Sequence, residues 1–144
     1  MPTVLITGAA SGIGRDTARL FASAGWQCVL VDHNGPALQA VGDSLPTSGG
    51  AAHLLRITDL TDAGQVASLR ESTPTLDAIV NNAGMSDTSN TPLVARAPAQ
   101  MARLLTLNLA APAAVVQACT PLLRPGARIV NVASGAGLRA IPWR

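Results

Sequence analysis

Hydrophobic and polar positions follow one another along the chain in blocks that predict an alternation of strands and helices. Apolar runs rich in β-branched residues predict five strands, over residues 3–7, 27–32, 51–57, 76–80 and 127–133. Helical spacing of the apolar positions between them predicts four helices, over residues 12–25, 35–45, 62–72 and 97–123. Near-continuous apolar strands joined by helices indicate a parallel sheet that is covered on both faces. The predicted fold is therefore an α/β doubly wound parallel sheet.

The helix ends and faces carry finer expectations. Gly25 is expected to end the first helix, Pro36 lies in the first turn of the second, and Thr61 is expected to cap the third. Pro112 lacks an amide hydrogen and is expected to bend the long fourth helix. The face of the first helix that is expected to pack on the sheet consists of Ile13, Thr17, Leu20, Phe21 and Ala24.

The composition is that of a folded domain with unusually little charge. Of the 144 residues, 48% are apolar and 12% are charged, about half the charged share of 25% that is usual in soluble domains. We therefore expect part of the apolar surface to meet another element, either a partner subunit or further chain. The net charge is +2 and the arginines are scattered, which argues against a nucleic-acid-binding surface.

Two further features bear on the compartment. Cys28 and Cys119 lie in apolar runs without metal-binding or redox spacing, as expected of buried, reduced thiols in a cytoplasmic protein. The N-terminus has no basic leader before its short apolar run, so no signal peptide is expected. The most apolar window, 104–123, is interrupted by polar residues and prolines. It is expected to be a buried helix of a soluble protein and not a membrane span.

The residues after the first predicted strand favour a phosphate-binding loop. The segment TGAASGIG places Gly8, Gly12 and Gly14 between a strand and a helix. Backbone N–H groups and the positive end of the helix would face an anion there, and glycines allow a diphosphate to approach closely. The spacing is G-x-x-x-G-x-G, which differs from the more familiar G-x-G-x-x-G, so an ordinary tight turn is the alternative.

Asp32 is the last residue of the second predicted strand. A carboxylate about 20 residues beyond such a loop suits hydrogen bonding to the ribose hydroxyls of an adenosine. It would also repel a 2′-phosphate, and no Arg stands at Ser11 or His33 to hold one. The sequence therefore favours NAD over NADP. The alternative is a strand-end Asp that caps the following turn.

Four motifs together resemble the classical short-chain dehydrogenase/reductase family. They are TGAASGIG, NNAG at 81–84, LLTLNLAAP and RIVNVAS, in that family's order and spacing, and the similarity extends from Thr3 to the last residue. The resemblance implies a Rossmann-like fold and NAD(P)-dependent transfer of hydride between nicotinamide and an alcohol or ketone. It also implies a small-molecule carbonyl or alcohol substrate and homo-oligomeric assembly.

The resemblance implies roles for individual residues. Asp59, next to Leu60, would contact the adenine ring, although an Asp that shapes a turn before a helix is the alternative. The NNAG segment would support the sheet and line the adenosine side of the cofactor, with a simple turn glycine as the alternative for Gly84. The cofactor-contacting set implied in this way is Gly8, Ser11, Gly12, Ile13, Gly14, Asp32, Asp59, Leu60, Asn81, Ala83 and Gly84.

Two residues are expected in the catalytic site. Asn108 falls on the apolar stripe of the long helix, where an unpaired buried amide would cost about 1–3 kcal/mol, so it should have a specific partner. A structural hydrogen bond is one explanation; the resemblance implies the active-site Asn that holds a water in a proton relay. Ser134 follows the fifth strand, and the resemblance implies the Ser that orients the substrate carbonyl, with a solvated loop Ser as the alternative. His33 and His53 form no metal-binding pattern.

The resemblance also implies a catalytic Tyr and a Lys four residues after it, and the 144 residues contain neither. That Tyr would follow Arg144 within a few residues. The segment ASGAGLRAIPWR is therefore expected to lead into the active-site helix, and the chain to be a truncated N-terminal part with little or no dehydrogenase activity by itself. A non-catalytic NAD-binding module, or a half-domain completed by a partner, is the alternative. A chain that does not fold stably alone is a third possibility, and the substrate is not identified by these residues.

Overall fold

In the computed structural model, which describes residues 1–47, 51–86 and 92–138, five strands form one sheet. The strands are β1 (Thr3–Thr7), β2 (Gln27–Asp32), β3 (Leu54–Ile57), β4 (Leu76–Asn81) and β5 (Leu123–Asn131). Their order across the sheet is β3-β2-β1-β4-β5, and every neighbouring pair is parallel. The prediction of a doubly wound parallel α/β sheet is confirmed.

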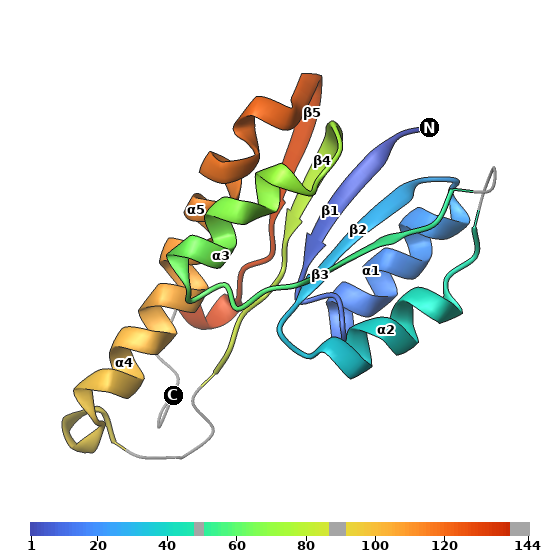
Figure 1. Cartoon of the computed structure of the whole chain (residues 1–144). Helices are drawn as coiled ribbons and strands as arrows, with labels where there is room; N and C mark the ends of the chain where they lie inside the picture. Colours follow the sequence, from blue (N-terminus) through green and yellow to red (C-terminus); the bar gives the residue numbers. More distant parts are fainter. Residues whose placement is uncertain (48–50, 87–91, 139–144) are drawn as a thin grey trace.

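Helices cover both faces of the sheet (Figure 1). One face carries α1 (Gly12–Ser23) and α2 (Gly35–Ser44); the other carries α3 (Ala63–Ser68) and α5 (Ala111–Cys119), while α4 (Pro98–Leu105) extends beyond the end of the sheet. A π-helical turn, Thr106–Ala110, and four short 3-10 turns complete the described helical structure; the 3-10 turns are Leu69–Glu71, Leu93–Ala95, Thr120–Leu122 and Gly135–Gly137. The chain thus folds as three layers, with the sheet in the middle.

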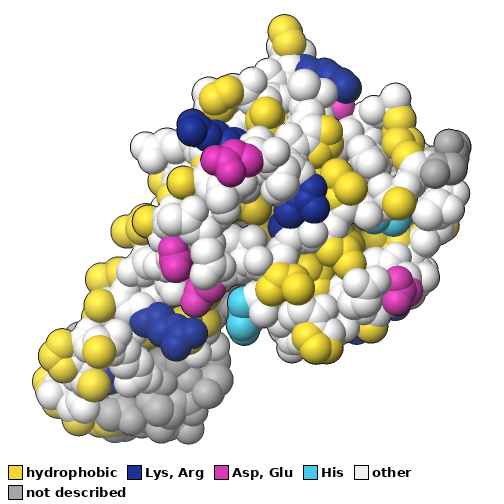
Figure 2. Space-filling model, viewed as in Figure 1, with side chains coloured by type: hydrophobic (Ala, Val, Ile, Leu, Met, Phe, Trp, Pro, Cys, Tyr) yellow, Lys and Arg dark blue, Asp and Glu magenta, His cyan; other side chains and the backbone are white. Residues whose placement is uncertain are grey.

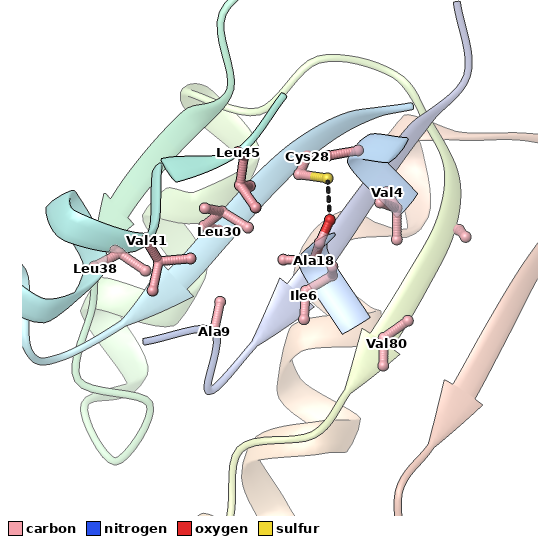
Figure 3. Packing of buried hydrophobic residues seen from close by; sticks show 12 residues of the cluster. Val4, Ile6, Ala9, Ala18, Cys28, Leu30, Leu38, Val41, Leu45 and Val80 are labelled. Carbon is pink, nitrogen blue, oxygen red and sulfur yellow. Dashed lines mark hydrogen bonds between the residues drawn. The ribbon is translucent and has the colours of Figure 1, made fainter. Parts of the chain in front are cut away.

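The central strand β1 contributes alternate side chains to two separate hydrophobic clusters. Val4 and Ile6 pack against α1 and α2 in the cluster shown in Figure 3. Leu5 points the other way and packs with residues of α3 and α5, among them Val66 and Val115. All five residues of β1 are buried, as expected for the middle strand of a sheet covered on both faces.

The face of α1 that packs on the sheet differs from the predicted one. Its buried residues are Gly14, Ala18 and Ala22, whereas Ile13 and Leu20 are 65% and 74% exposed. The buried residues are four apart and all small, so the helix backbone lies close to the sheet and leaves no room there for large side chains. The spacing rule was right about a helix, but its packing face was wrong for Ile13, Leu20 and Ala24, whereas Phe21 is half-buried and packs against the cluster on this side.

Several predicted boundaries also need correction. Strand β3 starts at Leu54 and not at residue 51, and the ring of His53 accepts a hydrogen bond at Nδ1 from the Cys28 amide, 3.1 Å away. Strand β5 begins at 123, earlier than predicted. The cap of α3 is Asp62 and not Thr61, because the Asp62 carboxylate accepts from two amides of the first turn at 2.8 and 3.0 Å.

The long fourth helix is interrupted at the place where Pro112 predicts irregularity. A π-helical turn, Thr106–Ala110, separates α4 from α5, and the amide of Ala111 donates to the carbonyl of Thr106, five residues back. Pro112 has no N–H group to donate to the carbonyl of Asn108, four residues before it, so the regular α-helical bond cannot form there. Such wide turns are frequent at functional sites.

Among the described residues, Pro98–Leu122 is the one helix that by length and composition could cross a membrane, with 25 residues and a mean hydropathy of 1.3. Core helices of soluble proteins meet the same two criteria, so this is weak support for a span. The expectation that the stretch is buried is wrong for most of it, since 17% of its most apolar window is buried. Ala111, Val115 and Cys119 make its buried contact with the sheet.

Candidate functional site

The carboxyl ends of β1 and β4 meet at the point where the strand order reverses, since β1 leads to β2 on one side and β4 leads to β5 on the other. In open α/β sheets this is where ligands bind. A cavity of about 490 Å³, here called the first cavity, lies at this point. Its lining comes from the loop after β1, the ends of β2 and β3, the segment after β4, and the helix after it.

Two glycines allow the loop after β1 to pack tightly. Gly8 has φ +66°, and a Cβ there would lie 2.8 Å from the Cα of Ala83. A Cβ on Gly14 would lie 2.1 Å from the carbonyl oxygen of Gly8, so α1 can approach the strand end only with glycine at this position. Gly12 differs, because a Cβ there would meet nothing within 4 Å. The loop is thus packed on one side and open on the other.

The first turn of α1 presents backbone donors at this opening. The amide of Arg15 donates to the carbonyl of Ser11, 3.2 Å away, which is the first bond of the helix. The amides of Gly12, Ile13 and Gly14 precede that bond, so the helix itself offers them no carbonyl. Ser11 occupies the N-cap position without a side-chain capping bond. A helix of 12 residues adds the positive end of its dipole, and the arrangement suits an anion.

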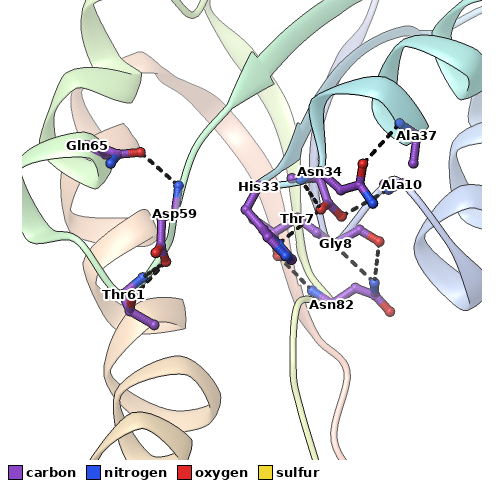
Figure 4. A network of polar contacts seen from close by, with 11 residues as sticks. Thr7, Gly8, Ala10, His33, Asn34, Ala37, Asp59, Thr61, Gln65 and Asn82 are labelled. Atoms are coloured by element: carbon purple, nitrogen blue, oxygen red, sulfur yellow. Dashed lines mark hydrogen bonds and ion pairs between the residues drawn. The ribbon is translucent and has the colours of Figure 1, made fainter.

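The NNAG segment is fixed to β1 by a set of polar contacts (Figure 4). The hydroxyl oxygen of Thr7, a residue only 2% exposed, accepts from the amides of Asn82 and Ala83 at 3.0 Å each. The side-chain amide of Asn82 in turn donates to the carbonyls of Thr7 and Gly8 at 3.1 and 3.3 Å. Asn82, a member of the NNAG segment that was not singled out individually, lines the first cavity and holds this segment against the end of β1.

Asp32 joins the end of β2 to the glycine loop. Its Oδ2 accepts from the amide of Ala10 at 3.1 Å, its Oδ1 accepts from the amide of Asn34 at 3.0 Å, and the side chain is 10% exposed. The turn-capping alternative is therefore realised, and the carboxylate still lines the first cavity. A carboxylate offers about four acceptor positions, so two intramolecular bonds leave capacity for ligand hydroxyls.

Asp59 shapes the turn between β3 and α3 and also lines the first cavity. Its Oδ1 accepts from the hydroxyl and the amide of Thr61 at 2.7 and 2.9 Å. These two bonds hold the pKa of Asp59 below its ordinary value, and the charges of Arg103 and His33 lower that pKa further. The neighbouring Leu60 is 8% exposed and belongs to the hydrophobic cluster under α3 and α5.

A second cavity of about 1270 Å³ adjoins the first and contains both residues predicted for catalysis, Asn108 and Ser134. The hydroxyl of Ser134 accepts from the amide of Ala136 at 3.2 Å. Asn81 also lines this second cavity and not the first; it is 3% exposed, and its side-chain amide donates to Asn131 Oδ1 at 2.9 Å. Asn81 therefore lies on the second cavity, and its contact with a cofactor stays a prediction.

Asn108 is exposed, so the expectation that it is buried is wrong. The expectation of a specific partner is confirmed, because both ends of its side chain bond the backbone of Met85 at 2.8 Å, Oδ1 as acceptor and Nδ2 as donor. A Cβ on Gly84 would lie 3.2 Å from Asn108 Oδ1. The wide turn of the helix thus holds the segment that follows β4.

The structure brings most of the predicted cofactor-contacting residues together. Nine of them line the first cavity: Gly8, Ser11, Gly12, Ile13, Asp32, Asp59, Leu60, Ala83 and Gly84. Gly14 and Asn81 do not line it. Asn82 lines it as part of the predicted NNAG segment. The other lining residues were not predicted: Ala10, His33, Asn34, Ala37, Thr58, Thr61, Met85, Arg103 and Leu107. Arg103 and Leu107 are four residues apart on one helix, and that spacing could have placed both on the face toward the site.

Neither a metal-binding cluster nor a reactive thiol occurs in the part of the chain that the structure describes. No group of three or more His, Cys, Asp or Glu close enough to hold a metal occurs there. Cys28 and Cys119 are buried free thiols, as predicted, and burial raises their pKa to about 12 and about 11. At neutral pH both are therefore protonated and unreactive.

A glycine loop, a helix N-terminus and a strand-end acid that meet where a parallel sheet reverses its order define a dinucleotide-binding type of α/β protein. The family model for short chain dehydrogenases matches residues 2–144, and the chain belongs to that family.

Three known proteins illustrate the relationship. The uncharacterized short-chain type dehydrogenase/reductase y4vI of Sinorhizobium fredii is 35% identical over 98% of this chain and 26% of its own length. The crystal structure of a short chain dehydrogenase/reductase from Burkholderia phymatum in complex with NAD has a TM-score of 0.88 and 31% identity, covering 98% of this chain and 52% of that one. A short-chain dehydrogenase from Sphingobium yanoikuyae in complex with NADPH has a TM-score of 0.83 and 32% identity, covering 96% and 55%. The chain thus spans about half or less of these proteins.

Proposed function

We propose that the protein is an oxidoreductase of the short-chain family that binds a nicotinamide dinucleotide in the first cavity, with NAD preferred over NADP. The observation that carries the proposal is the convergence on this cavity of the open glycine loop, the unpaired first-turn amides of α1 and the carboxylate of Asp32. The solved relatives from Burkholderia and Sphingobium, described in complex with NAD and NADPH, support a cofactor of this class.

The residues that line the first cavity suit the diphosphate, the adenosine ribose and the adenine base of such a cofactor. The open space beside Gly12 and the first-turn amides suit a diphosphate, since nothing lies where a side chain would otherwise project. The Asp32 carboxylate suits the ribose hydroxyls and disfavours a 2′-phosphate, which is the ground for preferring NAD. The apolar side chains of Leu60 and Leu107 in the same lining suit the faces of a flat aromatic base.

When bound, a nicotinamide cofactor supplies a carbon, C4, that accepts or releases hydride. The chain's own contribution would lie in the second cavity. Ser134, at the end of β5, would orient an alcohol or carbonyl oxygen through its hydroxyl. Asn108 would hold the segment at Met85 and help to place a water for proton transfer. Because Pro112 has no N–H group, the backbone carbonyl of Asn108 lacks the usual α-helical hydrogen bond from the residue four positions later.

The 144 residues contain no Tyr and no Lys, the two side chains that the family uses for the proton. A phenol with a neighbouring cation can be brought near neutral pKa, whereas neither a serine hydroxyl nor an amide can do this work. For the 144-residue chain alone we therefore propose cofactor binding with little or no turnover. The alternative of a non-catalytic NAD-binding module, or of a half-domain completed by a partner, rests on the same absence.

The substrate class proposed for the whole protein is a small alcohol or ketone, and a homo-oligomer in the cytoplasm is proposed with it. These follow from the family alone, since the chain covers only 26% of its Sinorhizobium relative and about half of the solved ones.

Titration calorimetry with NAD tests the proposal. Asp32→Ala should weaken NAD binding about tenfold or more, because a hydrogen bond to a charged group is lost. Asp43→Ala is the matched control, since it removes the same charge from an exposed position on α2, outside the first cavity. Asp32 also holds the amide of Ala10, so thermal unfolding of each variant is measured beside binding. No saturable binding by folded wild-type protein would refute the proposal.

A further inference from the structure

His33 lies beside the acid that is proposed to hold the cofactor ribose. Its Nδ1 is 3.3 Å from Oδ1 of Asp32, and it is 79% exposed where the Asp32 side chain is 10% exposed. Both line the first cavity. The imidazole therefore stands on the solvent side of the carboxylate, at the rim of the site. Resting on the proposed function, we propose that His33 makes the choice between NAD and NADP depend on pH, by accepting the 2′-phosphate of NADP when it is protonated.

The chemistry follows from the two charge states of the ring. With His33 neutral, the carboxylate of Asp32 repels a 2′-phosphate and the site favours NAD. Sites that take NADP place a cation near this position to receive the phosphate. Histidine becomes such a cation within the range of pH 5 to 8 in which it changes charge. A proton on Nδ1 would bind Asp32, and Nε2–H would then be the donor to the phosphate.

The charged groups that line the first cavity are nearly balanced, so one proton added to His33 removes the net negative charge that a bound phosphate meets. Asp32 at the end of β2 and Asp59 after β3 are acids, and Arg103 on α4 is a permanent cation. His33, Asp59 and Arg103 all line this cavity, and the charges of Arg103 and His33 lower the pKa of Asp59. Figure 2 shows charged and histidine side chains gathered at the hollow between α4 and α2. Among the described residues that line the cavity, two carboxylates outnumber one guanidinium until His33 takes a proton, which balances them.

Figure 4 shows how these side chains lie in the first cavity. His33 and Asn34 follow one another at the end of β2, and Asp59 lies on the opposite side of the cavity that all three residues line. Asn34 is occupied, because its carbonyl oxygen Oδ1 accepts from the amide of Ala37 at 3.2 Å and caps α2. His33 is thus the side chain of this turn whose charge can change while the fold of the turn stays the same.

The experiment measures the dissociation constants of NAD and NADP at about pH 5.5 and about pH 8, on either side of the histidine range. In the wild-type protein the ratio of the NADP constant to the NAD constant should fall on acidification about fivefold more than in His33→Asn, as expected for one partly exposed charge pair. The 2′-phosphate itself titrates near pH 6, but it does so equally in both proteins, so the difference between them isolates His33.

A second variant keeps the test decisive. His33→Arg carries a permanent cation, so it should bind NADP at pH 8 about as well as the wild type does at acid pH, and it should gain no affinity for NADP on acidification. An equal pH response in the wild type and His33→Asn, with NAD bound by both, would overturn the role of His33 and leave the proposed function intact. Absence of NAD binding at both pH values would instead remove the proposed function and this inference with it.

Discussion

The side chain of Asn108 and the backbone of Met85 form a reciprocal pair, in which Oδ1 accepts from the Met85 amide and Nδ2 donates to the Met85 carbonyl, both at 2.8 Å. The pair joins the π-helical turn, Thr106–Ala110, to the segment after β4 and so connects the two cavities. Asn108 therefore both fixes the backbone of the segment after β4 and occupies the position proposed for the proton relay.

Replacing Asn108 with Ala removes both bonds to Met85 and should lower the free energy of unfolding by about 1–2 kcal/mol. Urea unfolding measures this change. Gln117→Ala is the control, because it removes an exposed amide from α5 and should alter stability by less than about 0.5 kcal/mol. Equal stabilities of the two variants would mean that the pair with Met85 contributes nothing.

Gly14→Ala should destabilise the protein although alanine favours helices, because the new Cβ would lie 2.1 Å from the carbonyl oxygen of Gly8. Overpacking of this kind typically costs about 1–3 kcal/mol, and contact with backbone favours the upper end. Gly135→Ala is the control, since a Cβ there meets nothing within 4 Å. Chemical unfolding compares the two, and an undiminished stability of Gly14→Ala would contradict the close packing of α1 on β1.

Asp77 ties the starts of three strands together, accepting from the Thr3 amide at 2.8 Å and from Arg124 at 2.9 Å. The Thr3 amide first, and then Arg124, hold the pKa of Asp77 below its ordinary value of 3.8. A lowered pKa in the folded state contributes stability above the unfolded value, and that stability is lost as the pH falls through the folded value.

We therefore expect the free energy of unfolding to fall below about pH 4 and this fall to be smaller in Asp77→Asn. Stability is measured by denaturant unfolding between about pH 2 and 7, with Asp43→Asn as an exposed control on α2. An acid loss of stability that is unchanged in Asp77→Asn would show that other carboxylates cause it.

Strand β5 forms one edge of the sheet and exposes apolar side chains, including Val130 at 51%. An uncovered apolar edge strand tends to pair with another chain, so the 144-residue chain should self-associate as its concentration rises. Val130→Lys should reduce this association, whereas Leu20→Lys, at a position 74% exposed on α1, should not. Size-exclusion chromatography with light scattering measures it, and a wild-type chain that stays monomeric when concentrated would contradict the expectation.

The sequence predicted the strands of the sheet interior well, because their apolar runs are long enough to be buried on both faces. The sequence-based prediction failed for the packing face of α1, because the shape of the sheet surface determines which side chains fit against it. Ala18 and Ala22 of α1 face the sheet because the close approach that Gly14 permits leaves room only for small side chains, and a rule that follows large apolar residues cannot foresee this. Likewise, the strand bounds near His53 depend on its contact with Cys28, 25 residues away in sequence.

The site was predictable where local motif and strand end coincide, as at Gly8, Gly12 and Asp32. Arg103 and Leu107 were missed because they reach the first cavity from α4 and the π-helical turn, distant in sequence from the glycine loop. Asn108 was assigned to a buried stripe by helical spacing, but the wide turn at 106–110 changes which residues share a face. The spacing of apolar residues assumes a regular α-helix, so it cannot predict which residues share a face beyond a π-helical turn.

A crystal structure of the protein grown with NAD tests the central claim most directly. The account predicts diphosphate oxygens within hydrogen-bonding distance of the first-turn amides of α1, around Gly12 and Ile13, and ribose hydroxyls on the carboxylate of Asp32. NAD bound elsewhere on the protein, or bound at the first cavity with its ribose turned away from Asp32, would contradict it.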